Sequence, residues 1–140
     1  LRFVAKLFGM EEDRAVIPHG HRNMVSAHLV LSGRIHLRQY ERVAEEKDAL
    51  IVRPSVDVHV EAGHPSTISD ERNNVHWLIA RGGRAHTLDV ILLGIDPGKP
   101  EYAIDNLDAE SDEPISGGLL RMPTMAVEDA LRKYGHDHHG

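Results

Sequence analysis

Short β-rich segments separated by turn residues recur along most of the chain and limit the folds open to it. The breaks between these segments include Ser32-Gly33, a charged run at 45–48 and Gly82-Gly83. We interpret Gly82-Gly83 as a hairpin turn. Spacing of this kind is typical of a β-sandwich or barrel, because βαβ units need long helical segments between strands. We therefore predict an all-β fold with strands at 1–8, 14–17, 26–31, 34–40, 49–53, 56–60, 67–69, 74–80 and 86–93.

Alternation predicts which side chains of two strands face the core. Ile35 and Leu37 should point inward, and the basic residues beside them, His36 included, should face solvent. In 56–60 the valines should take the core face and Asp57 and His59 the other face.

The composition changes after Pro97, but no second domain is indicated. We predict one domain over 1–140, with its core at about 14–95 and an acidic loop, a short helix and a His-rich tail at 96–140. One extended segment is expected near 102–104. The helix should cover 125–134, with Thr124 as its N-cap and Gly135 as its C-terminal stop. The tail contains His136, His138 and His139, which can bind metal adventitiously.

Charge and composition argue against several classes of partner. Acidic residues outnumber basic ones by 22 to 16, so a phosphate-binding surface and a nucleic-acid partner are not expected. No apolar run approaches the roughly 20 residues that span a bilayer, so no membrane association is expected. Cysteine is absent, which excludes disulfides and thiolate metal sites. With no signal-peptide pattern at the start, we expect a cytoplasmic protein.

Two histidines on one strand are the main indication of function. His19 and His21 are two residues apart, so on an extended strand both side chains point to one face. A third imidazole from another strand, His76, would complete a three-nitrogen cradle for a divalent metal such as Fe, Ni, Cu or Zn. The alternative is that these are ordinary surface residues, since a chain with 11 histidines produces such pairs by chance.

The spacing around this pair resembles the first motif of the cupin superfamily, whose members are small β-barrels. His19, His21 and Gly33 fall on the motif, whereas Ser26 stands where many cupins carry a metal-binding Glu. The resemblance implies a single cupin jelly-roll barrel, here followed by the short C-terminal helix.

A narrower resemblance is to the thiol dioxygenases of the cysteamine dioxygenase and plant cysteine oxidase type. The matching pieces are Pro18-His19-Gly20-His21, Met24, 29–33, Asn74-Val75-His76 and 88–92. The resemblance implies Fe(II) held by His19, His21 and His76, and a dioxygenase that uses O2 on a small thiol substrate. Zn, Ni or Mn are alternative metals. A non-catalytic cupin that binds a small ligand, and a metal-dependent isomerase or hydrolase, are alternative functions.

Two further residues are candidates for catalysis. His28 follows Ser26 by two residues and should share its face, where it could be a fourth ligand, support a metal-bound imidazole, bind substrate or have a purely structural role. Asp89 is either a satisfied polar residue in a covered strand or, as the resemblance suggests, a carboxylate that lines the pocket.

The face opposite the presumed pocket predicts a partner subunit. Ala27, Leu29 and Leu31 lie on that face and need cover, and 90–93 is apolar on both faces. We therefore expect a homodimer.

Overall fold

The computed structural model describes residues 1–100 and 103–135. The tail histidines and Tyr102 lie outside this part of the chain. Within the described residues, nine β-strands form one continuous sheet and one α-helix follows, which confirms the predicted all-β fold with a short C-terminal helix. The strands are β1 (Arg2–Met10), β2 (Ala15–Arg22), β3 (Met24–Glu46), β4 (Ala49–Glu61), β5 (Pro65–Ile68), β6 (Val75–Leu93), β7 (Ala103–Asn106), β8 (Glu113–Pro114) and β9 (Leu120–Pro123).

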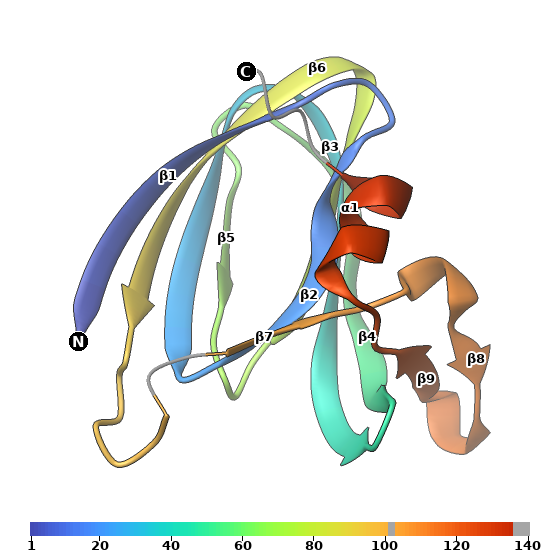
Figure 1. The fold of residues 1–140 in the computed structure, drawn as a ribbon. Helices are drawn as coiled ribbons and strands as arrows, with labels where there is room; N and C mark the ends of the chain where they lie inside the picture. Colours follow the sequence, from blue (N-terminus) through green and yellow to red (C-terminus); the bar gives the residue numbers. More distant parts are fainter. Residues whose placement is uncertain (101–102, 136–140) are drawn as a thin grey trace.

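The sheet curls into a barrel with two walls that share β3 and β6 (Figure 1). In one wall, β1 pairs with the C-terminal half of β6, which pairs with the N-terminal half of β3, and β5 pairs with β3. The other wall has the order β7-β2-β6-β3-β4-β9-β8. All these strand pairs are antiparallel, so each wall can present alternate side chains to the interior.

Three predicted divisions are wrong, because β3, β4 and β6 are each continuous where two strands were predicted. At Gly33 the φ angle is +82°, and the register between β3 and β6 shifts on both sides of Ser32. Gly82-Gly83 is not a hairpin turn, because β6 keeps β3 as its partner before and after these glycines. Left-handed backbone at these positions bends each strand, and the bend lets β3 and β6 pass from one wall to the other.

The core confirms both predicted faces except at one valine: Val60 is buried and Val56 packs against the same core cluster. Ile35 and Leu37 are fully buried. Val58, however, is 41% exposed, because β9 covers only the first residues of β4 and leaves the rest of β4 as an edge. His36 was expected in solvent but is only 8% exposed, since it stacks on His59 and contacts Asp57 on the outer face.

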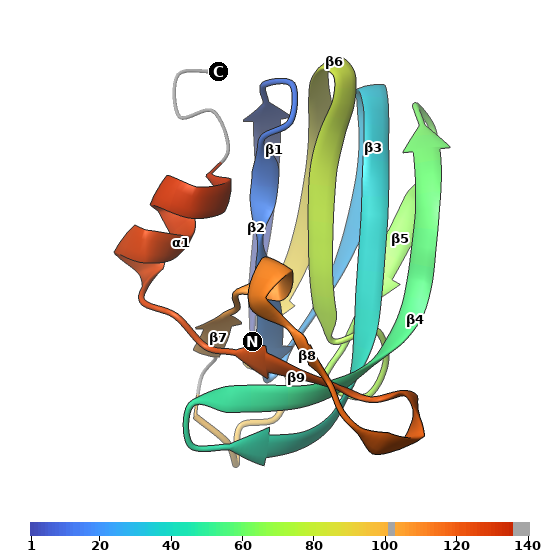
Figure 2. The same ribbon diagram turned by 90° about the vertical axis from the view of Figure 1, so that its right-hand side faces the viewer.

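Helix α1 (Val127–Tyr134) lies against β2 on the outside of the barrel (Figure 2). Its N-cap is Ala126 rather than Thr124, whose backbone N–H instead donates to the carbonyl of Asp48. Gly135 ends the helix as predicted, with its N–H donating to the carbonyl of Leu131. Tyr134 packs edge-on against the buried Trp77, which anchors α1 to the core. Within the described residues, no helix has the length and apolar character needed to cross a membrane.

Candidate metal centre

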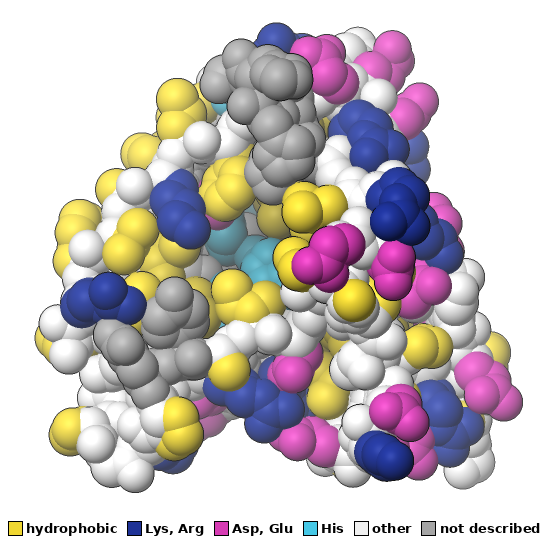
Figure 3. All heavy atoms as spheres, in the orientation of Figure 1, with side chains coloured by type: hydrophobic (Ala, Val, Ile, Leu, Met, Phe, Trp, Pro, Cys, Tyr) yellow, Lys and Arg dark blue, Asp and Glu magenta, His cyan; other side chains and the backbone are white. Residues whose placement is uncertain are grey.

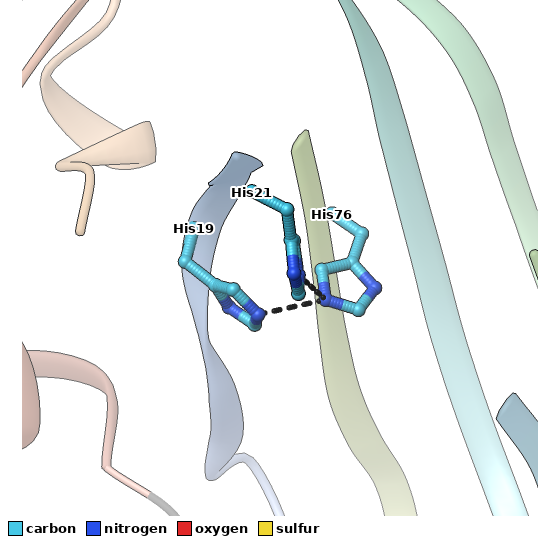
Figure 4. Close-up of side chains that lie close together, drawn as sticks. All are labelled: His19, His21 and His76. Atoms are coloured by element: carbon cyan, nitrogen blue, oxygen red, sulfur yellow. Dashed lines mark hydrogen bonds between the residues drawn. The ribbon is translucent and has the colours of Figure 1, made fainter. Parts of the chain in front are cut away.

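The three histidines predicted to bind metal lie together inside the barrel (Figure 4). His19 and His21 project from β2, and His76 projects from β6, where it stands directly opposite His19 in the strand register. The Nε2 atom of His76 lies 2.9 Å from Nε2 of His19 and 3.3 Å from Nε2 of His21. Three ring nitrogens from two strands therefore converge on one point.

The partners of the Nδ1 atoms determine which ring nitrogens carry lone pairs. Nδ1 of His19 faces the carbonyl oxygen of Ile17, which can only accept a hydrogen bond. Nδ1 of His21 lies 2.8 Å from the thioether sulfur of Met24, which is also an acceptor. Both Nδ1 atoms must therefore hold the proton, and both Nε2 atoms present a lone pair to the cluster.

Burial keeps these imidazoles neutral. It lowers the pKa of His19 to about 4, although this ring keeps part of its surface open to a cavity. Burial, reinforced by the charges of neighbouring histidines, holds the pKa of both His21 and His76 well below the ordinary range. Neutral imidazole is the form that coordinates a metal, so the cluster is ready to bind one near neutral pH.

The donor set fits a divalent cation. Two imidazole nitrogens bound at about 2.1 Å and at right angles lie about 3.0 Å apart, close to the distances found here. If Nε2 of His76 carried a proton, it could donate that proton to Nε2 of His19 or of His21, but not to both. The lone pair of the remaining Nε2 atom would then have no hydrogen-bond donor in the cluster. A cation at the point of convergence would satisfy all three nitrogens. The geometry does not select among Fe, Ni, Cu and Zn, because imidazole suits each of them.

Asn74 clamps the backbone of His21. Its side-chain oxygen accepts from the His21 N–H at 3.2 Å, and its side-chain nitrogen donates to the His21 carbonyl at 2.7 Å. Arg42 donates to the same Asn74 oxygen and to the same carbonyl. A Cβ at Gly20 would stand 2.7 Å from the Arg42 guanidinium, so the close approach expected at this glycine is observed. The clamp fixes the direction in which His21 points.

A cavity of about 360 Å³ opens over His19 and His21, whereas the fully buried His76 does not line it. Figure 3 shows histidine side chains at the bottom of this hollow, with hydrophobic side chains around it. Both walls of the barrel line the cavity, and most of its lining side chains are apolar. Its polar residues near the histidines are Ser26, His28, Asp89 and Asn106.

The two candidate catalytic residues lie side by side in this cavity. Nδ1 of His28 is 2.7 Å from a carboxylate oxygen of Asp89, and both side chains are almost completely buried. On the other side of its ring, Nε2 of His28 is 3.2 Å from the hydroxyl of Ser26. His28 is therefore not one of the converging ligands, but its ring centroid lies only 4.5 Å from that of His76.

Sequence reasoning missed several residues that shape the site. Asn74 was noted only as part of a motif, and Arg42 was not considered, because a clamp on a distant strand has no local signature. Strand β1 was expected, but its contribution of Arg2 and Lys6 to the cavity wall was not. Alternation within β1 could have shown that these two residues share a face.

Comparisons with known proteins identify the fold. No family model matches the chain, and no curated protein matches it. A sugar phosphate isomerase from a cupin superfamily, from Silicibacter pomeroyi, superposes with a TM-score of 0.57 at 13% identity, covering 93% of this chain and 71% of that one. A Klebsiella pneumoniae protein with a double-stranded β-helix domain gives 0.50 at 16% identity, covering 73% of each chain.

Procruciferin, an 11S globulin from Brassica napus, gives a TM-score of 0.54 at 14% identity over 76% of this chain. The match spans only 23% of that much longer protein. At these identities the likeness concerns the fold alone. The protein therefore has the cupin jelly-roll fold, and inside it stands a group of three histidines that could hold a divalent metal ion.

Proposed function

We propose that the protein is a metal-dependent dioxygenase that oxidises a small thiol. The observation that carries the proposal is the convergence of three neutral imidazoles, without a carboxylate, beside a largely apolar cavity that two of them line. A bound Fe(II) would supply a Lewis-acidic position for the thiolate and the electrons that O2 chemistry requires. The overall reaction is RSH + O2 → RSO2H, in which both oxygen atoms end on the sulfur.

The residues around the cluster have complementary tasks. Apolar side chains from both walls, such as Ile17 and Ile91, exclude water from the reacting groups. His28 stands beside His76 and can take the thiol proton, while the Asp89 carboxylate stabilises the imidazolium that results. Because Ser26 is not a carboxylate, a metal held by the three histidines would have no negatively charged ligand, which would favour binding of an anionic thiolate.

The experiment measures product and oxygen together. The three tail histidines are first changed to Ser, so that metal bound by the tail does not count. The protein is loaded with Fe(II) and given cysteamine, cysteine and 3-mercaptopropionate, with O2 uptake followed by an electrode and sulfinate by mass spectrometry. We expect equal amounts of O2 consumed and sulfinate formed, and neither in the His76→Ala variant. Iron-loaded protein that turns over no thiol would overturn the proposal.

A second candidate function rests on the His28–Asp89 pair. A buried imidazole held by a carboxylate is a suitable general base, and in an isomerase it would move a proton between two carbons of a substrate polarised by the metal. This alternative predicts exchange of a substrate C–H with D2O, measured by NMR, that is lost in His28→Gln. A thiol dioxygenase would show no such exchange.

We also propose a homodimer, formed through the outer face of the wall that contains β1. Phe3 and Leu7 are each 66% exposed on this face, beside the half-exposed Leu29, Leu31 and Val90. Hydrophobic side chains gather along the same side in Figure 3. Within the described residues β1 pairs only with β6, so its other edge can pair with β1 of a second copy about a twofold axis.

Light scattering after size exclusion tests this interface. We expect a dimer for the protein and a monomer for the Leu7→Lys/Leu31→Lys double variant. A wild-type monomer at micromolar concentration would rule the interface out. We also propose a cytoplasmic location for the protein, which fractionation of the source cells tests.

A further inference from the structure

We propose that the cavity selects substrates with a negatively charged group, and that Lys6 binds this group. The inference rests on the proposed function only in taking the cavity as the substrate site. The substrate class that it implies is a small thiol that carries a carboxylate.

Lys6 is placed on the cavity wall by the alternation of β1. Arg2, Val4, Lys6 and Phe8 line the cavity, whereas Phe3 and Leu7 point outward. Lys6 stands directly opposite Asp89 in the register of β1 and β6, and cross-strand partners project to the same side of a sheet. The ammonium group therefore belongs to the same chamber as the His28–Asp89 pair.

With a divalent metal bound, the charges of the chamber would not balance. Asp89 is the only carboxylate that lines it within the described residues, and His28 already stands 2.7 Å from Asp89. Lys6 forms no ion pair with any described residue, and its charge reaches His19, whose pKa it helps to lower. A divalent metal on three neutral imidazoles would add two positive charges. The missing partner is an anion, and the substrate can supply it.

The chamber also limits the distance between the two ends of the substrate. A cavity of about 360 Å³ holds only a small molecule. A thiol at the histidines and a carboxylate toward β1 would use both features of the site. A carboxylate fits the single ammonium of Lys6 and would gain a charge-assisted hydrogen bond from it.

Binding rather than turnover tests the inference. Three probes share a two-carbon spacer and differ in charge: 3-mercaptopropionate is negative, 2-mercaptoethanol neutral and cysteamine positive. The protein with Ser in place of the tail histidines is loaded with Co(II), and each probe is titrated while the thiolate-to-cobalt absorption band is followed. We expect 3-mercaptopropionate to bind most tightly, and Lys6→Gln to weaken it about fivefold while leaving 2-mercaptoethanol unchanged.

Two variants serve as controls. Lys6→Arg keeps the positive charge and should retain the preference for 3-mercaptopropionate. Lys47→Gln makes the same change of charge in the exposed turn between β3 and β4, far from the cavity lining, and should have no effect. Equal affinity for the three probes, or an equal loss for all three in Lys6→Gln, would overturn the inference.

A separate measurement covers the case in which no probe produces the cobalt band. That result would count against the proposed thiol chemistry but not against anion binding. Saturation-transfer NMR on the metal-free protein then compares propionate with its neutral analogue propionamide. We expect propionate to bind more tightly and to lose this advantage in Lys6→Gln. Equal binding of the two molecules would refute the role of Lys6.

Discussion

Two pairs of histidines in this protein share one backbone arrangement and have opposite surroundings. His19 stands opposite His76 in the register of β2 and β6, and His36 stands opposite His59 in the register of β3 and β4. In the inner pair, His19 and His76, the rings meet edge to face and the two Nε2 atoms are 2.9 Å apart. In the outer pair, His36 and His59, the rings are stacked and their planes differ by 22°.

The difference lies in what each Nε2 atom meets. Nε2 of His36 donates its proton to the carboxylate of Asp57, so this nitrogen has no lone pair to offer a metal. In the inner pair, the carbonyl of Ile17 binds Nδ1 of His19 and leaves Nε2 directed at the cluster. Cross-strand pairing brings histidines together, but the acceptors around them decide whether they can become ligands.

The largest expected difference between the pairs is in metal affinity. With the tail histidines changed to Ser, His76→Ala should lose bound metal almost completely, because two of three ligands cannot hold the ion well. His59→Ala should keep the wild-type metal content, measured by elemental analysis after dialysis. Equal metal content in the two variants would show that the inner cluster is not the metal site.

A smaller loss of metal affinity should follow when the Asn74 clamp on the backbone of His21 is removed. Asn74→Ala leaves all three imidazoles in place but frees the backbone of His21, so we expect metal affinity to fall roughly 10- to 100-fold. The matched control is Asn73→Gly, because Asn73 has a φ angle of 50° that glycine adopts without strain. Competition with a metal chelator measures both affinities. An unchanged affinity in Asn74→Ala would contradict the role of the clamp.

Acid should destabilise the metal-free protein through the inner cluster. The folded pKa of His19 is about 4, below the ordinary value of 6.5, so between these values the unfolded chain binds more protons than the folded one. Stability is therefore complete above pH 6.5 and falls as the pH drops toward 4. We expect urea denaturation to show a loss of roughly 1–2 kcal/mol between pH 7 and pH 5, reduced in His19→Gln. A flat profile over this range would contradict the burial of neutral histidines.

The smallest effect should come from the outer pair. The hydrogen bond from His36 lowers the pKa of Asp57, so this contribution is present above the ordinary pKa of Asp and is lost only in more acidic solution. Because Asp57 is largely exposed, Asp57→Asn should cost less than about 1 kcal/mol at pH 7, measured by urea denaturation. Metal affinity should not change. A drop in metal affinity would show that the two histidine pairs are coupled.

Local sequence patterns carried much of the fold and the core of the site. The period of two along a strand placed Ile35 and Leu37 in the interior, and it put His19 and His21 on one face. The same rule placed Leu29 and Leu31 on the outer face, where both are partly exposed. Gly135 marked the end of the helix because no side chain obstructs its cap. These results depend on residues close together in the chain.

Long-range pairing settled what local patterns could not. Breakers at Gly33 and Gly82 became bends inside strands because β3 and β6 remain partners on both sides. His36 became buried because β4 brings Asp57 and His59 against it. Asn74, Arg42 and Lys6 acquired their places only when distant strands met around the cavity. The side-chain period of a strand is local, whereas the partner of a polar atom depends on which strand lies beside it.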